Sequence, residues 1–295
     1  MWISDKWTDY ELIDASGGER LERWGDYVLI RPDPQIIWSG DREDPRWKRA
    51  HGVYRRSGGG GSWKVADFPE SWTVRYGGMT FTVRPMGFKH TGIFPEQAAN
   101  WDYASRMIRS ALERDPGREV RVLNLFAYTG CATVACAKAG ASVCHVDASK
   151  GMVGAAKVNM ERSGLSDAPC RYIVDDCMKF VRREIRRGKK YDAVIMDPPS
   201  YGRGPGGEVW KLEDCADELI TLVRGVLSDD PVFFLINSYT TGLSPASMGY
   251  MLMRSLGGTA ESGVLETDET GLPVTDSGLI LPCGASARWS ASKYL

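Results

Sequence analysis

The chain has few residues that bind metals or form disulfides. Only three histidines occur among 295 residues, at His51, His90 and His145, and they lie far apart in the sequence. The seven cysteines are an odd number and show no CxxC spacing. The sequence therefore disfavours a zinc site, metal catalysis and a disulfide framework, and we interpret the cysteines as reduced thiols.

Long apolar runs and a strong net charge are also lacking. No segment approaches the roughly 20 apolar residues of a membrane-spanning helix, and the first residues lack the apolar region of a signal peptide. We therefore expect a cytoplasmic protein with no membrane partner. The formal net charge of −1 disfavours non-specific coating of nucleic acid but leaves room for a local basic patch. Nothing in the sequence predicts the oligomeric state.

Two regions differ in their sequence patterns. Residues 1–85 contain short aromatic and apolar runs, such as 27–30 and 36–38, separated by Pro, Gly and Asp. This pattern predicts β-hairpins, and we expect a β-rich module that recognises a substrate or acts as a lid. Residues 86–295 alternate strand and helix patterns, which predicts an α/β domain with a doubly wound, mostly parallel sheet.

The second region contains six predicted strands and four predicted helices. The strands are 120–126, 142–146, 172–174, 193–196, 232–236 and 278–281. The helices are 131–138, 149–162, 177–187 and 212–227, and Ser149 is the predicted cap of the second one.

The first strand-to-helix turn, residues 124–131, is poor in glycine. Ligands of open α/β sheets bind beyond the carboxyl ends of the strands, so this turn is the first place to look for a site. A dinucleotide site would have GxGxxG here, whereas only Gly130 is present, and no P-loop sequence GxxxxGK[ST] occurs;. The turn therefore suits a nucleoside without phosphates, and a nicotinamide oxidoreductase is the less favoured alternative.

An aspartate follows each of the next two strands. Asp147 comes 17 residues after Gly130, near the offset at which an acid binds ribose hydroxyls. Asp176 follows the third strand, where it would accept a hydrogen bond from an adenine amino group. Either residue could instead stabilise the N-terminus of the helix that follows it.

The segment 197–202 directly follows a buried strand and reads Asp-Pro-Pro-Ser-Tyr-Gly. Pro198 and Pro199 fix the backbone and remove donors, so their carbonyls can accept hydrogen bonds from a substrate amine. Tyr201 can stack on a planar ring. We predict that Asp197, Pro198, Pro199 and Tyr201 form the catalytic set; the alternative is a rigid turn with no chemical role.

Taken together, these segments resemble the family of bacterial large-subunit (23S) ribosomal RNA methyltransferases and their uncharacterised relatives. The similarity lies in 92–97, 124–130, 146–149, Asn159 and 197–202. It implies a Rossmann-like class I methyltransferase fold for residues 86–295 and S-adenosylmethionine (SAM) as cofactor. It implies contacts of Phe94 and Gln97 with SAM, of Phe126, Tyr128, Thr129 and Gly130 with its methionine end, of Asp147 with ribose and of Asp176 with adenine. The predicted cofactor set also includes their neighbours Ala148, Ser149 and Cys177.

The expected reaction is methyl transfer from SAM to a base nitrogen in RNA, with ribosomal RNA as the partner and no metal. Family members that methylate cytosine C5 carry a cysteine after the fifth strand, but residues 236–240 contain none. A second interpretation is a small-molecule methyltransferase. A third is a non-catalytic, cofactor-binding module associated with RNA.

Basic and aromatic residues are interleaved between Arg42 and Lys64. This pattern suits a phosphate backbone with stacked bases, although a solvated hairpin face would look the same. A second basic cluster, residues 182–190, is interpreted as a complement to the C-terminus of the predicted helix 177–187.

Overall fold

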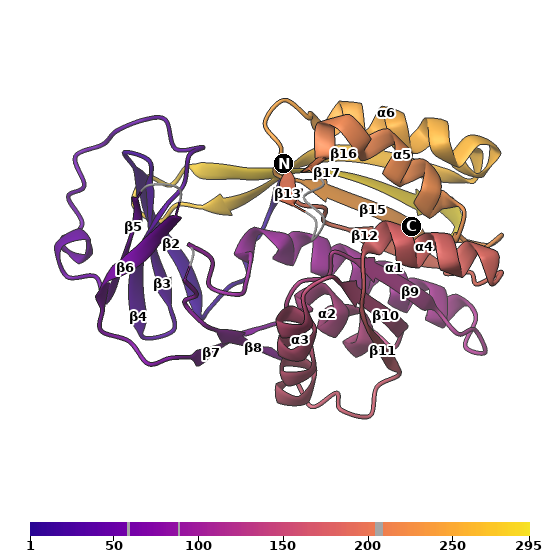
Figure 1. Ribbon diagram of the computed structural model, residues 1–295, viewed down its shortest axis with the longest axis horizontal. Helices are drawn as coiled ribbons and strands as arrows, with labels where there is room; N and C mark the ends of the chain where they lie inside the picture. The colour runs from indigo at the N-terminus through magenta and orange to yellow at the C-terminus, as the bar shows by residue number, and fades with distance from the viewer. Residues whose placement is uncertain (58–59, 88, 204–208) are drawn as a thin grey trace. The chain divides into compact units, whose positions relative to one another are not determined.

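A computed structural model describes residues 1–57, 60–87, 89–203 and 209–295. The chain divides into two units (Figure 1). The larger unit consists of Met1, Ala99–Thr270 and Gly284–Leu295, and the smaller one of Trp2–Ala98 and Gly271–Cys283. The smaller unit thus extends beyond residue 85 and includes a C-terminal segment. Among the described residues, no helix combines the length and the apolar character needed to cross a membrane.

A large sheet has the strand order β1-β16-β17-β15-β12-β9-β10-β11. Its central strands pair in parallel, and β17 runs antiparallel to β15. The bounds are β1 Trp2–Ile3, β9 Arg121–Leu125, β10 Ser142–Asp147, β11 Cys170–Val174, β12 Ala193–Met196, β15 Phe233–Ser238, β16 Gly263–Pro273 and β17 Ile280–Ala291. The predicted doubly wound, mostly parallel sheet is confirmed.

The six α-helices of the described chain lie in or border the larger unit. They are α1 Ala98–Arg114, α2 Cys131–Lys138, α3 Lys150–Arg162, α4 Cys177–Arg186, α5 Leu212–Arg224 and α6 Pro245–Leu256. The four predicted helices are present, whereas α1 and α6 were not predicted. The buried residues of α1 include Trp101, Ala104, Ile108 and Ala111. Their spacing of three or four residues is typical of one face of a helix and could have predicted α1 from the sequence.

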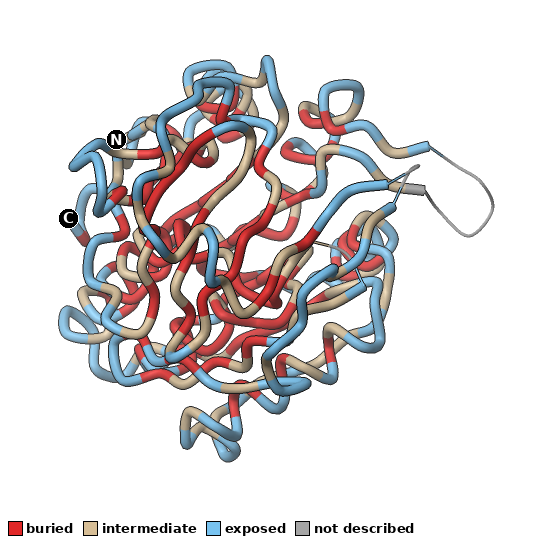
Figure 2. The backbone as a smooth tube through the Cα atoms, turned by 90° about the vertical axis from the view of Figure 1, so that its left-hand side faces the viewer, coloured by how far each residue is buried: buried red, intermediate tan, exposed pale blue. Residues whose placement is uncertain are grey.

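The core of the larger unit is the parallel sheet. All four residues of β12 and all six residues of β15 are buried. β12 and residues 233–236 of β15 are continuously apolar, as expected for strands covered on both faces;. Asn237 and Ser238 at the end of β15 are buried polar residues. Figure 2 shows buried residues gathered in the interior and exposed ones in the outer loops.

The smaller unit contains a five-stranded sheet in the order β2-β3-β4-β5-β6 and a separate β7-β8 hairpin. The bounds are β2 Tyr10–Ser16, β3 Glu19–Trp24, β4 Tyr27–Pro32, β5 Gly52–Ser57, β6 Gly60–Ala66, β7 Trp72–Tyr76 and β8 Met79–Val83. The β-rich prediction is confirmed. The prediction that residues 36–38 form part of a β-hairpin is wrong, because this segment does not pair with another strand. Instead, the Trp38 indole donates a hydrogen bond to the Ala15 carbonyl at 2.7 Å.

Candidate functional site

The predicted site residues of the larger unit lie at one edge of its sheet. Strand β9 pairs in parallel with both β10 and β12, so the carboxyl ends of the three strands meet at the same edge. The turn after β9, Asp147 at the end of β10 and Asp197 after β12 therefore come together there. This is where open α/β sheets bind their ligands.

The turn after β9 has an unusual backbone. Phe126 and Tyr128 have φ angles of 54° and 50°, in the left-handed region that non-glycine residues seldom adopt. Hydrogen bonds from Ala127 N to Val146 O at 3.1 Å and from Tyr128 N to Asp147 Oδ2 at 2.9 Å hold this conformation. Strained backbone that its surroundings stabilise is typical of binding sites.

Gly130 ends this turn and begins α2. Its φ is 79°, and a Cβ atom here would lie 2.6 Å from the Cβ of Ala156 on α3. Both the conformation and the close approach therefore require glycine. The neighbouring Thr129 carbonyl accepts from the Asn159 amide at 2.9 Å, so α3 fixes the turn at two adjacent residues.

A buried polar cluster also supports the turn. The hydroxyl of Thr133 accepts from the Asn124 amide at 2.9 Å and contacts Nδ1 of His145 at 2.9 Å. Burial lowers the pKa of His145 to about 4, so the ring is neutral near pH 7. His145 therefore has a structural role in this cluster.

Asp147 binds backbone groups with both carboxylate oxygens. Oδ2 accepts from Tyr128 N, and Oδ1 accepts from Ser149 N at 2.8 Å. Ser149 is the N-cap of α3, as predicted, and accepts from Met152 N at 3.4 Å. The alternative structural role of Asp147 is thus present. Each oxygen can accept a second bond, and the ribose contact stays a prediction, as do the contacts of the exposed Ala148 and Ser149.

Asp176 and Cys177 begin α4. Asp176 caps this helix by accepting from Lys179 N at 2.8 Å. This is the structural role that the sequence offered as an alternative; the contact of Asp176 with adenine stays a prediction. The buried Cys177 sulfur accepts from Phe126 N at 3.3 Å, and burial raises the pKa of its thiol. Cys177 thus links α4 to the turn as a neutral thiol.

Phe94 and Gln97 belong to the smaller unit. Phe94 precedes a short 3₁₀ helix, Pro95–Gln97, of which Gln97 is the last residue, and Gln97 N donates to Phe94 O at 3.0 Å. The Phe94 ring lies 5.3 Å from that of His90. Their approach to SAM stays a prediction from the family resemblance.

Three hydrogen bonds from other parts of the chain hold the segment that begins at Asp197. Asn237 Nδ2 donates to Asp197 Oδ1 at 2.9 Å, Thr240 Oγ1 donates to Ser200 Oγ at 2.8 Å, and Trp210 Nε1 donates to Pro199 O at 2.6 Å. The predicted rigidity of this segment is therefore supported by its surroundings as well as by its prolines.

The predicted catalytic residues of this segment differ in their exposure to solvent. Pro198 is buried and Pro199 is exposed, and one lone pair of the Pro199 carbonyl is engaged by Trp210. Tyr201, on β13 (Tyr201–Arg203), is 51% exposed, so its ring is accessible for stacking. Sequence reasoning missed Trp210, on β14 (Val209–Lys211), as well as Asn237 and Thr240, because their partners are distant in sequence.

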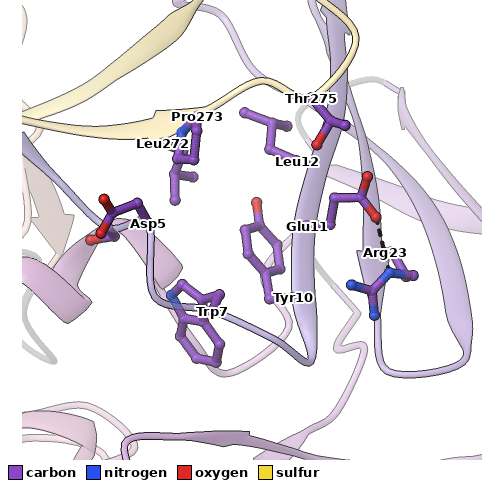
Figure 3. Close-up of a pocket in the computed structure, with 10 residues that line it drawn as sticks. Asp5, Trp7, Tyr10, Glu11, Leu12, Arg23, Leu272, Pro273 and Thr275 are labelled. Carbon is purple, nitrogen blue, oxygen red and sulfur yellow. Dashed lines mark hydrogen bonds and ion pairs between the residues drawn. The ribbon is translucent and has the colours of Figure 1, made fainter. Parts of the chain in front are cut away.

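A cavity of about 170 Å³ lies within the smaller unit (Figure 3). Its lining includes Trp7, Tyr10 and Arg23, which bond to Pro95 O, Glu22 and Glu11 respectively. These bonds hold the unit together, and none of the predicted site residues lines the cavity. In the ranges that the structure describes, no group of three or more His, Cys, Asp or Glu side chains could hold a metal ion.

The basic residues considered for RNA binding are partly paired within the protein. Arg46 pairs with Asp44, Arg42 and Arg55 both pair with Glu19, and the Arg42 guanidinium also lies 4.2 Å from the Trp47 ring centre. In contrast, Lys48, Arg49, Arg56 and Lys64 are exposed. On α4, Arg182 pairs with Glu218 and Arg183 with Asp175, which agrees with a structural role for that cluster.

Two curated relatives align with about half of the chain. One is ribosomal RNA large subunit methyltransferase I of Photobacterium profundum, 29% identical over 162 residues, which are 55% of this chain and 38% of the relative. The other is ribosomal RNA large subunit methyltransferase K/L of Shewanella frigidimarina, 31% identical over 163 residues, 54% of this chain and 21% of the relative. The chain thus spans well under half the length of these relatives.

Solved structures match over nearly the whole chain. SMU.776, described as a methyltransferase and complexed with SAH, is 19% identical with a TM-score of 0.72; the match covers 97% of this chain and 76% of that one and concerns the fold. The SAM-dependent methyltransferase of Agrobacterium tumefaciens is 35% identical with a TM-score of 0.89 and covers 98% of this chain and 92% of its own. Residues 47–212 match the S-adenosylmethionine-dependent methyltransferase family. The predicted family is thereby confirmed: this chain belongs to the S-adenosylmethionine-dependent methyltransferases, and SAM is its cofactor.

Proposed function

We propose that this enzyme transfers the methyl group of SAM to an amino nitrogen on a base of RNA. The observation that carries the proposal is the segment after β12. There the fixed carboxylate of Asp197 and the half-exposed ring of Tyr201 lie four residues apart at the ligand-binding edge of the sheet. An acceptor for N–H groups beside a stacking surface suits a planar ring that carries an amine.

Asp197 acts on the nucleophile in this proposal. Its carboxylate accepts a hydrogen bond from the target N–H, which turns the nitrogen lone pair toward the methyl carbon. When bound, SAM supplies a methyl group on a sulfonium leaving group. The N–C bond forms as the C–S bond breaks with its electron pair on sulfur, and the extra proton on nitrogen leaves to water. Positioning accounts for most of the rate, so no histidine base is required.

The cofactor residues proposed here surround the turn after β9. Phe126, Tyr128, Thr129 and Gly130 belong to the turn itself, while Asp147 supplies a carboxylate at the end of β10 and Asp176 one after β11. Acids at two neighbouring strand ends suit the hydroxyls and amino group of a nucleoside. Ala148, Ser149 and Cys177 border these carboxylates. The roles of Phe94 and Gln97, which belong to the smaller unit, are proposed from the family resemblance alone.

An RNA substrate is supported by the ribosomal RNA methyltransferases among the relatives and by the exposed cations Lys48, Arg49, Arg56 and Lys64. Cations of this kind bind phosphates without reading sequence. A ribosomal RNA target would also require the cytoplasmic location that the sequence predicts.

The class of acceptor is tested with methyl-labelled SAM. The enzyme is incubated with separate RNA, protein and metabolite fractions of a bacterial lysate. We expect label in RNA. Label in the metabolite fraction alone would support a small-molecule methyltransferase, and SAM binding without transfer to any fraction would support a non-catalytic module.

The target site is tested with Tyr201→Ala and Asp197→Ala. Loss of stacking is worth about 1–3 kcal/mol, so Tyr201→Ala should lower turnover and leave SAM affinity nearly intact. Asp197→Ala should cost more, since misplacing a reacting group by about 1 Å can cost roughly 100-fold. Parallel loss of melting temperature, SAM affinity and turnover in both variants would instead identify a structural turn.

A further inference from the structure

A buried series of hydrogen bonds ends at Asp197. Arg288 on β17 donates from Nε and Nη2 to Asn100 Oδ1, at 2.9 and 2.7 Å. Asn100 Nδ2, on α1, donates to Ser286 Oγ at 3.2 Å. Ser286 Oγ donates to Asn237 Oδ1 at 2.7 Å, and Asn237 Nδ2 donates to Asp197 Oδ1 at 2.9 Å.

The two ends of this series fix its direction. A guanidinium only donates and an ionised carboxylate only accepts, so Asn100 turns its oxygen toward Arg288 and its nitrogen toward Ser286. The Ser286 hydroxyl accepts from Asn100, and its one proton goes to the Asn237 oxygen. The Asn237 amide then has only its NH₂ group to present to Asp197. A cation thus orders every polar group between itself and Asp197.

Burial leaves the series no alternative partner in water. Arg288 and Asn100 are 4% and 3% exposed, and Ser286 and Asn237 are fully buried. Burial lowers the pKa of Arg288 to about 10, which still leaves it protonated at neutral pH, and the Tyr103 ring lies 4.7 Å from its guanidinium. A reversed amide would place two acceptors or two donors face to face in this dry interior, at a high free-energy cost.

Strand register brings these residues together. Asn237 pairs with Ser286 across β15 and β17, and Ile236 pairs with Met196 across β15 and β12. Asn237 is therefore beside Ser286 on one side and one residue beyond the last β12 pair on the other, where Asp197 begins its loop. Two ladders of the sheet thus determine the alignment of the series.

We propose that Asn237, ordered through Ser286 and Asn100 by Arg288, is a positioning residue for methyl transfer: it fixes the orientation of the Asp197 carboxylate toward the target nitrogen. The inference rests on the proposed role of Asp197. It assigns a function in the reaction to four residues that do not touch the substrate themselves: Asn237, Ser286, Asn100 and Arg288.

The test removes the Ser286 hydroxyl from the middle of the series and compares this variant with the same substitution at a matched serine, Ser290. Ser290 is on the same strand and face as Ser286, is equally buried, and bonds to the Tyr103 hydroxyl instead, at 2.6 Å. The acceptor is whichever fraction takes up label from SAM. We expect Ser286→Ala to lower kcat about 10-fold, with SAM affinity within about twofold of wild type, because Asp197 loses its fixed orientation. Ser290→Ala should lower the melting temperature similarly and keep full turnover.

Asn237→Asp is the second variant. It preserves the side-chain shape and the bond from Ser286 but turns an oxygen toward Asp197, so we expect kcat to fall about 100-fold. This variant also keeps the proposal testable if Ser286→Ala fails to fold. Full turnover in a folded Ser286→Ala or Asn237→Asp protein would overturn the proposal.

A double-mutant cycle separates this inference from the proposed function. If Ser286 acts through Asp197, adding Ser286→Ala to Asp197→Ala should slow the enzyme no further; additive losses would refute the positioning role. An inactive Asp197→Ala beside a fully active Ser286→Ala would overturn only the positioning role. An unimpaired Asp197→Ala would overturn both the proposed target site and the role of the series.

Discussion

The indole of Trp210 donates a hydrogen bond to the carbonyl oxygen of Pro199 at 2.6 Å, while its ring lies 5.9 Å from that of Phe126. One side chain therefore touches both the segment proposed to hold the target and the turn proposed to hold SAM. Cross-strand pairing with Gly202 keeps Trp210 in this place. The contact gives the two halves of the proposed reaction a fixed relative position.

Trp210→Phe should reduce turnover while SAM affinity is nearly retained. Phenylalanine keeps an aromatic ring beside Phe126 but cannot donate to Pro199, and one neutral hydrogen bond is worth about 0.5–1.5 kcal/mol, or roughly 2- to 10-fold. Trp72→Phe is the control, since it loses an indole bond to the Trp24 carbonyl in the smaller unit. Single-turnover methyl transfer and calorimetry measure the two quantities; equal turnover in both variants would contradict a role for the Pro199 contact.

Gly130→Ala should destabilise the protein and weaken SAM binding. The new Cβ would meet Ala156 at 2.6 Å in addition to the strain of a φ of 79°. Gly164→Ala is the matched control because its φ is 71° and its Cβ would meet open space. Denaturant unfolding should show a loss about 1–3 kcal/mol larger for Gly130→Ala, the usual cost of overpacking. Equal losses of unfolding free energy in the two variants would mean that α3 can move to accommodate the new Cβ without loss of stability.

Asp147→Ala should weaken SAM binding by about 1.5–3 kcal/mol if the carboxylate makes charge-assisted bonds to ribose. It should also lower the melting temperature, because Tyr128 N and Ser149 N lose their acceptor. Ser244→Ala, which removes the side-chain cap of α6, controls for lost stability alone. Calorimetry on the three proteins decides: wild-type affinity in Asp147→Ala would leave this residue with its structural role only.

The exposed cations of the smaller unit should determine the salt dependence of RNA binding. Replacing Lys48, Arg49 and Arg56 by Ala should flatten the log-log salt dependence by roughly 0.7 for each lost single-strand contact. Replacing Arg46 and Arg55 should change it less, since their charges are already paired with Asp44 and Glu19. Affinity measured across a salt series tests this expectation. An unchanged slope in the triple variant would identify the smaller unit as a lid or scaffold.

Local patterns determined much of the fold. The small residues of α2 and the caps at Ser149 and Asp176 lie where the sequence predicts them, because propensity and capping act over three or four residues. The absence of GxGxxG in the first turn likewise disfavoured a dinucleotide site from the sequence alone. Helix α1 was missed although its buried spacing is periodic.

Contacts between distant residues could not be determined in this way. The sequence alone marked Asp197 as a candidate catalytic group, and it showed that residues 236–240 lack a cysteine. Only the tertiary structure showed that Asn237 donates a hydrogen bond to Asp197, and that Ser286, Asn100 and Arg288 continue this series of hydrogen bonds. The physical reason is that strand register, which depends on the packing of the whole sheet, decides which polar groups meet in the interior, and a buried polar group is stable only beside the partner that register supplies.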